Sequence, residues 1–136
     1  MIQITPHPID VAAVIRSVQA DEAGAVSAFV GTVRQHTAQR RVVRLEFDAY
    51  APMALREMEK IAATIRQRWA AQQIAIHHRV GTLTVGEVAV VIAVATTHRQ
   101  AAFEACQYAI DTLKQTVPIW KREVFEDGAV WVAAHP

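Results

Sequence analysis

Residues 87–96 read EVAVVIAVAT, and every position between the glutamate and the threonine is alanine, valine or isoleucine. A β-branched run without polar alternation is typical of a strand in the middle of a sheet that is covered on both faces. We therefore predict that this strand is central in its sheet. A second strand is predicted at 74–80, joined to the first through Gly81 and a turn at Val85 and Gly86.

Helices are predicted at three places along the chain. Residues 9–20 carry apolar side chains at helical spacing and predict a short helix. Pro52 opens a longer amphipathic helix that extends to about residue 71. A third helix is predicted from His98 to Thr116, where Pro118 stops it.

Two further strands are predicted in the first half of the chain. Residues 24–33 are small, apolar and β-branched, which predicts a buried strand. Residues 42–50 alternate between apolar and charged side chains, which predicts a strand with one wet face. We expect the two to form a hairpin with a long, mobile connection through the polar and basic residues 35–41.

At the end of the chain, the strands predicted at 119–125 and 129–133 flank Asp127-Gly128, a dipeptide that indicates a type I′ hairpin. The predicted fold is therefore α+β, a mainly antiparallel sheet with about three helices packed on one side of it. A chain of 136 residues suits one domain, which we expect to span residues 1–136.

Composition narrows the class of protein. Hydrophobic residues make up 52% and charged residues 20%, which is typical of a globular chain. The formal net charge of +1 argues against wrapping of nucleic acid. The apolar run at 88–95 is too short to span a bilayer, and residues 1–5 do not resemble a signal peptide. Cys106 is the single cysteine, which fits a reducing compartment. We expect a soluble protein of the cytoplasm, without contact to membranes or nucleic acid.

The start of the third predicted helix is a candidate anion site. Residues 97–100 fit a capping box in which Thr97 is the N-cap and Gln100 reaches back to it. A helix start offers unpaired backbone N–H groups and the positive end of the helix dipole. His98 and Arg99 add cationic groups where the dipole disfavours them, so a bound anion would compensate them. The alternative is that Thr97 only caps the helix and that both side chains are solvated.

Lys114 and Lys121 form the second candidate feature. Lys114 falls on the last turn of the same predicted helix, and Lys121 lies on the strand after Pro118. Each has a simple structural explanation, because a lysine at a helix end complements the dipole and a strand lysine is ordinarily at the surface. A lysine becomes a nucleophile or a general base only when burial or neighbouring cations lower its pKa, and Arg122 and the other lysine could supply those cations. Arg34, at the end of an apolar strand, could bring a guanidinium that suits a phosphate, or could be a surface residue.

Other chemical signals are weak. Cys106 shares an apolar helical stripe, which predicts a core residue rather than a nucleophile. His77 and His78 point to opposite faces of one strand and therefore cannot ligate one metal together. The sequence has no metal-binding or nucleotide-binding motif, so we expect neither a metal nor a cofactor.

Several stretches, taken in order, resemble the catalytic large subunit of molybdopterin synthase. They run from about Gly24 to Val132 and include Phe29-Val30-Gly31-Thr32-Val33-Arg34, Arg79-Val80-Gly81, Gly86-Glu87, His98-Arg99, Asp111, Leu113-Lys114 and Pro118-Ile119-Trp120-Lys121-Arg122-Glu123. The ordered set, with its spacing between the two lysines, is specific to that family.

The resemblance implies a hammerhead-like α/β fold and a defined reaction. Members of this family transfer sulfur from the C-terminal thiocarboxylate of a small ubiquitin-like carrier subunit to cyclic pyranopterin monophosphate, forming the dithiolene of molybdopterin. The carrier ends in Gly-Gly, and the large subunit forms a homodimer within a heterotetramer. No cofactor takes part, and molybdenum enters later on another protein.

The resemblance also implies a set of site residues. Lys114 and Lys121 would be catalytic, and the substrate-binding residues would be Thr32, Val33, Arg34, His98, Arg99, Lys114, Lys121, Arg122 and Glu123. Family members often have a further arginine near the C-terminus, whereas this chain has His135 there.

The residue chemistry agrees with this reaction, because Arg34, His98 and Arg99 suit a cyclic phosphate and the two lysines suit the anionic carrier terminus. The competing interpretation is a non-catalytic anion-binding module or oligomeric scaffold, which would give no reason for the lysine pair.

Helix geometry adds a prediction about assembly. Arg99 and Lys114 are 15 residues apart on one predicted helix. At 1.5 Å per residue they are separated by about 22 Å, too far for both to touch one small pterin. If both serve one site, that site must combine two subunits at a two-fold interface.

Overall fold

The computed structural model describes residues 1–133, which form two sheets and three helices. In the first sheet the strand order is β1 (Ile2–Thr5), β5 (Gln73–Arg79), β7 (Val88–Thr96) and β2 (Ala25–Thr32). In the second the order is β3 (His36–Thr37), β4 (Arg40–Ala49), β8 (Ile119–Phe125) and β9 (Gly128–Ala133), and β6 (Gly81–Thr84) also pairs with β4. Only β1 and β5 pair in parallel within the described residues, so the predicted α+β class is confirmed.

Strand β7 is the centre of the first sheet, as its sequence predicts. Residues 89–96 of this strand are all buried, and β7 pairs with β5 on one side and β2 on the other. Alternate side chains point to the two faces, so Ile92 belongs to the larger hydrophobic core and Val91 to a smaller one.

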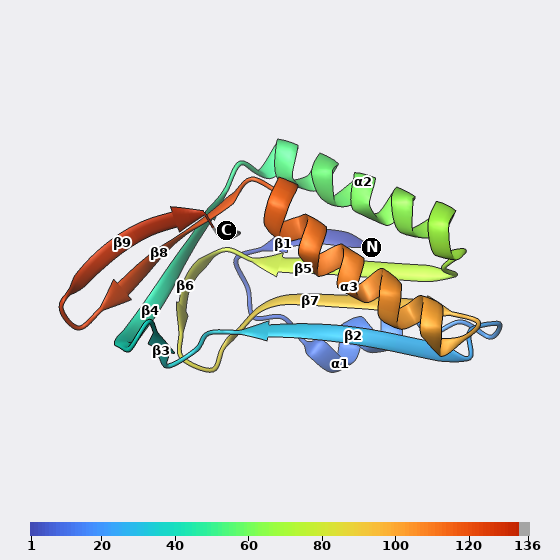
Figure 1. Ribbon diagram of the computed structural model, residues 1–136, viewed down its shortest axis with the longest axis horizontal. Helices are drawn as coiled ribbons and strands as arrows, with labels where there is room; N and C mark the ends of the chain where they lie inside the picture. The colour runs from blue at the N-terminus through green and yellow to red at the C-terminus, as the bar shows by residue number, and fades with distance from the viewer. Residues whose placement is uncertain (134–136) are drawn as a thin grey trace.

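The helices lie on both faces of this sheet, which corrects the expectation that they share one side. Helices α2 (Ala51–Trp69) and α3 (Arg99–Thr116) cover the face of the larger core. Helix α1 (Val11–Ser17) packs on the opposite face through Val14 and Val18 (Figure 1). Asp10 caps α1 by accepting a hydrogen bond from the backbone N–H of Ala13 at 3.1 Å.

Strand β2 is an edge strand, whereas the sequence predicted a buried strand paired with β4. Its residues alternate between half-buried and exposed, and Val26 and Val30 are each 39% exposed. A register irregularity lies between Gly31 and Thr32, Thr32 still pairs with Val88 of β7, and the chain then passes to the second sheet. Small apolar side chains fit both a central strand and an edge strand, so composition alone did not separate the two.

The connection between β2 and β4 also differs from the expected long loop. Residues 36–41 contain the short strand β3, and Ala38 and Gln39 form its turn to β4 with φ angles of 49° and 66°. In β4 a register irregularity between Val42 and Arg44 leaves Val43 exposed and Val42 buried. The regular alternation predicted for this strand therefore fails at its beginning.

The remaining elements agree more closely with the predictions. The amphipathic α2 buries Met58, Ile61 and Ile65, and α3 ends before Pro118. The β8–β9 hairpin is present, but its loop is formed by Glu126 and Asp127, because Phe125 pairs with Gly128. Gly128 is the only residue of this turn with a positive φ, so the predicted type I′ turn at Asp127-Gly128 is wrong.

The second sheet extends from one end of the first, and α2 and α3 run above the first sheet toward that junction (Figure 1). No helix within residues 1–133 has the length and apolar character needed to cross a membrane.

The end of α2 gives a test of this backbone geometry. Ala70 is the C-terminal cap of α2 with φ 49° and ψ 41°, a left-handed conformation in which glycine is favoured. We expect Ala70→Gly to raise the free energy of unfolding by about 0.5–1 kcal/mol, because it removes the Cβ strain. Urea unfolding measures the change. Ala71→Gly is the matched control and should lower stability, so equal effects at both positions would contradict this backbone conformation.

Candidate active site

A cavity of about 120 Å³ lies where the two sheets meet, and we call it the lysine pocket. Strands β2, β4, β5, β7 and β8 and helix α3 all contribute to its wall. Its polar side chains are Thr32, His78, Lys114 and Lys121, and the rest of its wall is apolar or glycine. Lys121 is partly buried at this wall, whereas Lys114 is exposed to solvent.

Lys114 reaches the pocket from the last turn of α3, where the negative end of the helix dipole favours a cation. Lys121 reaches it from β8 with a side chain that is 23% exposed. The Nζ atom of Lys121 lies 3.2 Å from Oε1 of Glu123, whose side chain is 9% exposed. The nearly buried carboxylate of Glu123 therefore has Lys121 as its ion-pair partner, as a charge in such a place requires.

Lys114 differs from Lys121 in this respect. No carboxylate of residues 1–133 lies within ion-pair distance of Lys114. The pocket thus combines one lysine with a fixed partner and one lysine without a partner in the described chain. The sequence indicated the pair, and the difference between its members comes from the alternation of β8, which puts Glu123 on the same face of the strand as Lys121.

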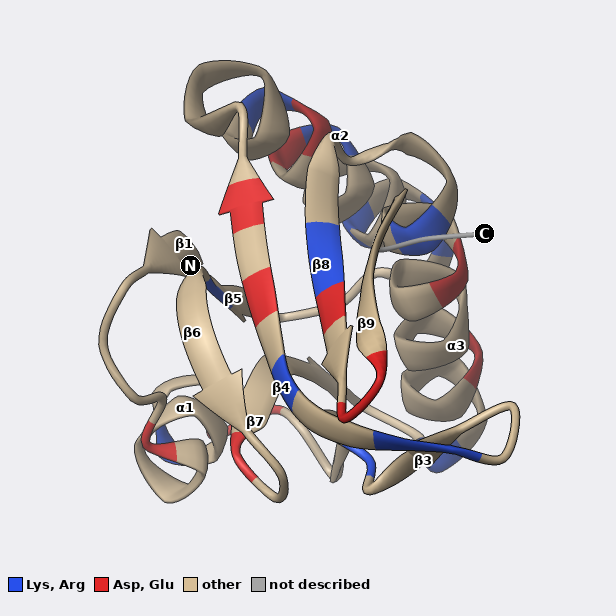
Figure 2. Cartoon of the chain, turned by 90° about the vertical axis from the view of Figure 1, so that its left-hand side faces the viewer, with Lys and Arg blue, Asp and Glu red and all other residues tan. Residues whose placement is uncertain are grey.

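Arg122 points away from the pocket. Neighbouring residues of a strand face opposite sides of a sheet, so Arg122 lies on the face of β8 opposite to Lys121 and Glu123. It forms an ion pair with Glu46 on the adjacent strand β4, and Nη1 of Arg122 lies 3.2 Å from Oε1 of Glu46. Figure 2 shows this face, on which acidic segments of β4 lie beside the basic segment of β8.

The segment after β2 brings one predicted residue to the pocket and places two elsewhere. Thr32 lines the pocket at the end of the strand. Val33 is 3% exposed, and its backbone N–H and C=O pair with the Glu87 carbonyl at 3.0 Å and the Gly86 N–H at 2.9 Å. Arg34 is exposed in the loop that follows and is not part of the pocket wall.

His98 and Arg99 are exposed at the far end of α3 from Lys114. The predicted capping box is wrong, because His98 occupies the N-cap position and its side chain makes no capping hydrogen bond. The Thr97 hydroxyl instead accepts a hydrogen bond from Gln72 at 3.0 Å, and Gln100 donates to Glu104 at 2.7 Å. The side chains that were expected to cap this helix are therefore engaged elsewhere.

His78 is a pocket residue that sequence reasoning missed. It is 3% exposed, and its Nδ1–H donates to the Arg79 carbonyl oxygen at 2.8 Å. Burial lowers the pKa of His78 to about 4, so the ring is neutral at physiological pH. The sequence did place His77 and His78 on opposite faces of one strand, and the structure confirms this, since His77 lines a different cavity.

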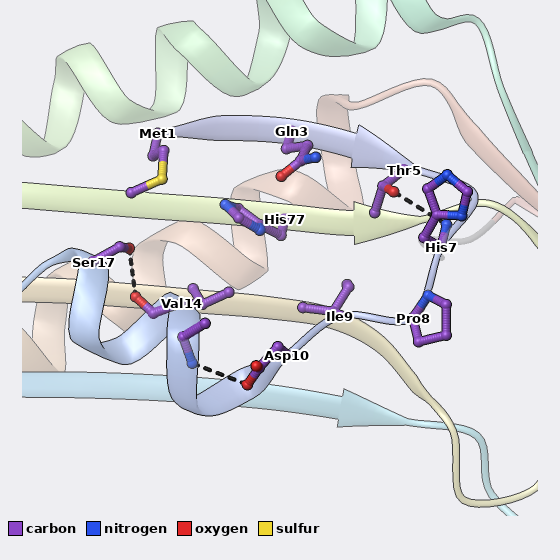
Figure 3. Close-up of a pocket in the computed structure, with 11 residues that line it drawn as sticks. Met1, Gln3, Thr5, His7, Pro8, Ile9, Asp10, Val14, Ser17 and His77 are labelled. Carbon is purple, nitrogen blue, oxygen red and sulfur yellow. Dashed lines mark hydrogen bonds between the residues drawn. The ribbon is translucent and has the colours of Figure 1, made fainter.

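That second cavity, of about 360 Å³, lies between β1, α1 and β5 (Figure 3). Its wall includes Met1, His7, Ile9, Asp10 and His77, and none of its lining residues is lysine or arginine. The second cavity is larger than the lysine pocket, but it contains no residue of the predicted site.

Cys106 is buried beside β2, as predicted, and burial raises the pKa of its thiol. A thiol in this state is a poor nucleophile. The cysteine therefore contributes packing to α3 rather than chemistry.

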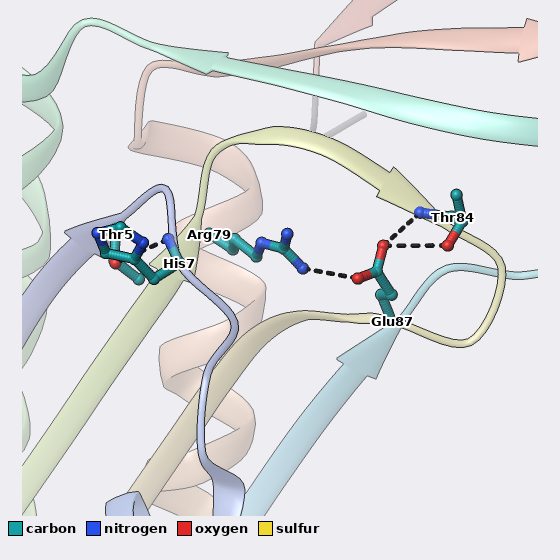
Figure 4. A network of polar contacts seen from close by, with 5 residues as sticks. All are labelled: Thr5, His7, Arg79, Thr84 and Glu87. Carbon is teal, nitrogen blue, oxygen red and sulfur yellow. Dashed lines mark hydrogen bonds and ion pairs between the residues drawn. The ribbon is translucent and has the colours of Figure 1, made fainter.

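An ion pair closes the corner between the end of β5 and the start of β7 (Figure 4). Nη1 of Arg79, at the end of β5, lies 3.0 Å from Oε1 of Glu87, just before β7. The other carboxylate oxygen of Glu87 accepts hydrogen bonds from the backbone N–H and the hydroxyl of Thr84, at 2.6 and 3.1 Å. Three segments of the sheet junction are thereby joined through one carboxylate.

Comparisons with known proteins agree with each other. The model of the MoaE protein family matches residues 4–116. The molybdopterin synthase catalytic subunit of Bacillus subtilis is 50% identical over 130 residues, covering 96% of this chain and 83% of that protein. The subunit of the same name from Homo sapiens is 44% identical and covers 96% of this chain and 70% of that protein. The crystal structure of molybdopterin synthase from Staphylococcus aureus superimposes with a TM-score of 0.91 at 38% identity, covering 95% and 94% of the two chains.

The corner formed by Arg79, Thr84 and Glu87 predicts how the free energy of unfolding depends on pH. The Thr84 backbone N–H, followed by the Arg79 guanidinium, holds the pKa of Glu87 below its ordinary value of 4.5. Glu87 therefore stabilises the fold above that ordinary value, and this stabilisation is lost as the pH falls through the lowered pKa of the folded state. We expect Glu87→Gln to flatten the decline of unfolding free energy in this acid range.

Chemical unfolding at a series of pH values measures the decline. Glu57→Gln is the matched control, since Glu57 pairs only with the exposed Lys60 on α2. An acid decline that is as steep in Glu87→Gln as in the parent protein would contradict the role given to this corner.

Proposed function

Because the chain belongs to the MoaE protein family, we propose that it acts as the catalytic subunit of a molybdopterin synthase. In this reaction sulfur passes from the C-terminal thiocarboxylate of a small carrier subunit to cyclic pyranopterin monophosphate, and the dithiolene of molybdopterin is formed. The observation that carries the proposal is the convergence of Lys114 and Lys121, from different elements, on one small pocket.

The pocket suits the anionic end of a peptide tail. The carrier ends in Gly-Gly, which has no side chains and can enter a narrow apolar channel. Its thiocarboxylate, and the carboxylate left after transfer, carry a negative charge that the two ammonium groups would neutralise. The thiocarboxylate sulfur is itself a good nucleophile, so the protein has mainly to align it and to stabilise developing charge.

The ion pair with Glu123 supports different roles for the two lysines. Lys121 forms an ion pair with Glu123 and would act electrostatically on the carrier terminus and the substrate. Lys114, without a carboxylate partner in residues 1–133, is free to exchange a proton with reacting groups. Arg34, His98 and Arg99 are the proposed contacts of the cyclic phosphate, and Thr32 and Glu123 border the lysines. Val33 and Arg122 would act through the backbone or through neighbouring charges, given where their side chains lie.

The name of the relatives, catalytic subunit, supports the presence of a second kind of subunit in the active enzyme. We propose that this partner is a small ubiquitin-like sulfur carrier with a Gly-Gly terminus, and that two copies of each chain form a heterotetramer. We also propose that residues 1–136 act as one domain.

The homodimer explains how His98 and Arg99 could reach the pocket. Helix α3 is continuous from Arg99 to Thr116, so the separation of about 22 Å between Arg99 and Lys114 holds. Strand β2 runs alongside α3 and has a free edge, and Phe103 beside it is 58% exposed. Antiparallel pairing of two β2 edges about a two-fold axis would bring the start of one α3 near the end of the other.

The direct test of function is a reaction with the thiocarboxylated carrier and cyclic pyranopterin monophosphate, followed by detection of the dithiolene product. Lys114→Ala and Lys121→Ala should each lower kcat/KM by about a hundredfold or more. Lys60→Ala, on the exposed face of α2, is the control and should be as active as the parent. A folded parent protein that forms no dithiolene would favour the competing interpretation, a non-catalytic anion-binding or scaffold module.

Subunit mixing tests the composite site. Arg99→Ala and Lys114→Ala are each expected to be inactive, but in a mixed dimer one site carries both changes and the other carries neither. Activity should therefore partly return after subunit exchange, with mixed dimers verified by native mass spectrometry. Mixed dimers without activity would place the whole site within one subunit.

A further inference from the structure

His78 is the polar group of the lysine pocket that the proposed chemistry leaves unused. The other three polar side chains of the pocket, Thr32, Lys114 and Lys121, already have a place in binding the carrier or the substrate. His78 lies deepest among these four, with 3% of its surface exposed. A buried imidazole that lines a pocket needs a partner for each ring nitrogen, because unpaired polar atoms are costly there.

The hydrogen bond to Arg79 fixes which nitrogen carries the proton. A carbonyl oxygen only accepts, so Nδ1 of His78 must be the donor in the 2.8 Å contact. In the neutral ring the other nitrogen, Nε2, then carries a lone pair and only accepts. His78 is thus held as an acceptor at physiological pH, and it differs from both lysines, which only donate.

The ring is also fixed in orientation. It meets the ring of Phe47 edge to face, with 5.3 Å between centroids and an angle of 68°. Phe47 is also paired in register with Lys121 on β8, so one residue is next to both the histidine and one of the two pocket lysines. On the other side, the Arg79 carbonyl belongs to the residue whose guanidinium is clamped by Glu87.

A peptide tail brings both kinds of hydrogen-bonding group into the pocket. Its anionic end requires donors, which the lysines supply. Its backbone N–H groups require acceptors, which lysines cannot supply. The Thr32 hydroxyl can accept, but Thr32 lies exposed at the rim, so the buried acceptor is His78.

We propose that Nε2 of His78 accepts a hydrogen bond from a backbone N–H of the carrier's Gly-Gly tail and thereby sets the direction in which the tail enters. This inference rests on the proposed function and deepens it. The lone pair of His78 repels an anion, so the anionic terminus is directed to the lysines. The histidine is a binding residue for the tail and takes no part in proton transfer.

Two variants of His78 distinguish the loss of its hydrogen-bond acceptor from the loss of its packing volume. In His78→Gln the amide oxygen can take the place of Nε2, whereas His78→Phe fills the space without an acceptor. We expect His78→Phe to raise the KM for the thiocarboxylated carrier about tenfold or more with a smaller change in kcat, because a buried N–H loses its partner. His78→Gln should remain within about threefold of the parent. Thermal unfolding verifies that both variants are folded.

A spectroscopic measurement does not depend on turnover. In protein with ¹⁵N-labelled histidine, the His78 Nε2 resonance should shift when the carrier with a carboxylate Gly-Gly terminus is added. A carrier that lacks its two terminal glycines should leave it unchanged. Equal KM values in parent and His78→Phe, equal losses in both variants, or a resonance that does not respond to the intact carrier would each overturn the inference. A parent protein that shows the shift but forms no dithiolene would instead refute the proposed function alone.

Discussion

A helix of 18 residues keeps its two ends about 27 Å apart, and this length separates the candidate site residues at the start of α3 from the one at its end. His98 and Arg99 stand at one end of α3, and Lys114 stands at the other. The α3 residues of one chain therefore cannot meet in one small site. In the proposed dimer, the β2 edge beside the helix would let two copies bring these residues together.

The lysine pocket depends on a second constraint, the junction of the two sheets. Arg79, Glu87 and Thr84 hold this corner together, and the same corner presents His78 to the cavity. Lys121 and Glu123 arrive on β8 with the alternation of a strand, which leaves Arg122 on the outside. Donors, an acceptor and an apolar wall thus meet in one cavity of about 120 Å³.

Much of this architecture could be predicted from the sequence, because strong local signals carried it. The apolar run of β7, the stripe of α2 and the stop at Pro118 each have a local physical cause. The edge position of β2 was not predictable in this way, since small β-branched residues suit both the centre and the rim of a sheet. The irregularity beside Val43 depends on pairing with the distant strand β8, and the turn at Ala38 and Gln39 places two residues other than glycine at positive φ, which local patterns do not indicate.

The candidate site residues were likewise predictable only where a local sequence pattern marked them. The lysine pair and the cationic start of α3 were visible as residue types at particular spacings. His78 was not, because its importance comes from burial and from a fixed proton on Nδ1, both of which depend on the tertiary fold. The capping role predicted for Thr97 was wrong for a related reason, because its hydroxyl accepts a hydrogen bond from Gln72 of another segment.

The central claim is that two copies of the chain complete each site by pairing along β2. Hydrogen–deuterium exchange of the backbone N–H groups of β2 that do not pair with β7 tests it most directly. Pairing predicts that these groups are protected in the dimer to a degree comparable with those of β7, and that dilution to monomer exposes them. Rapid exchange of the same groups in an intact dimer would contradict the account, because the two copies would then meet along another surface.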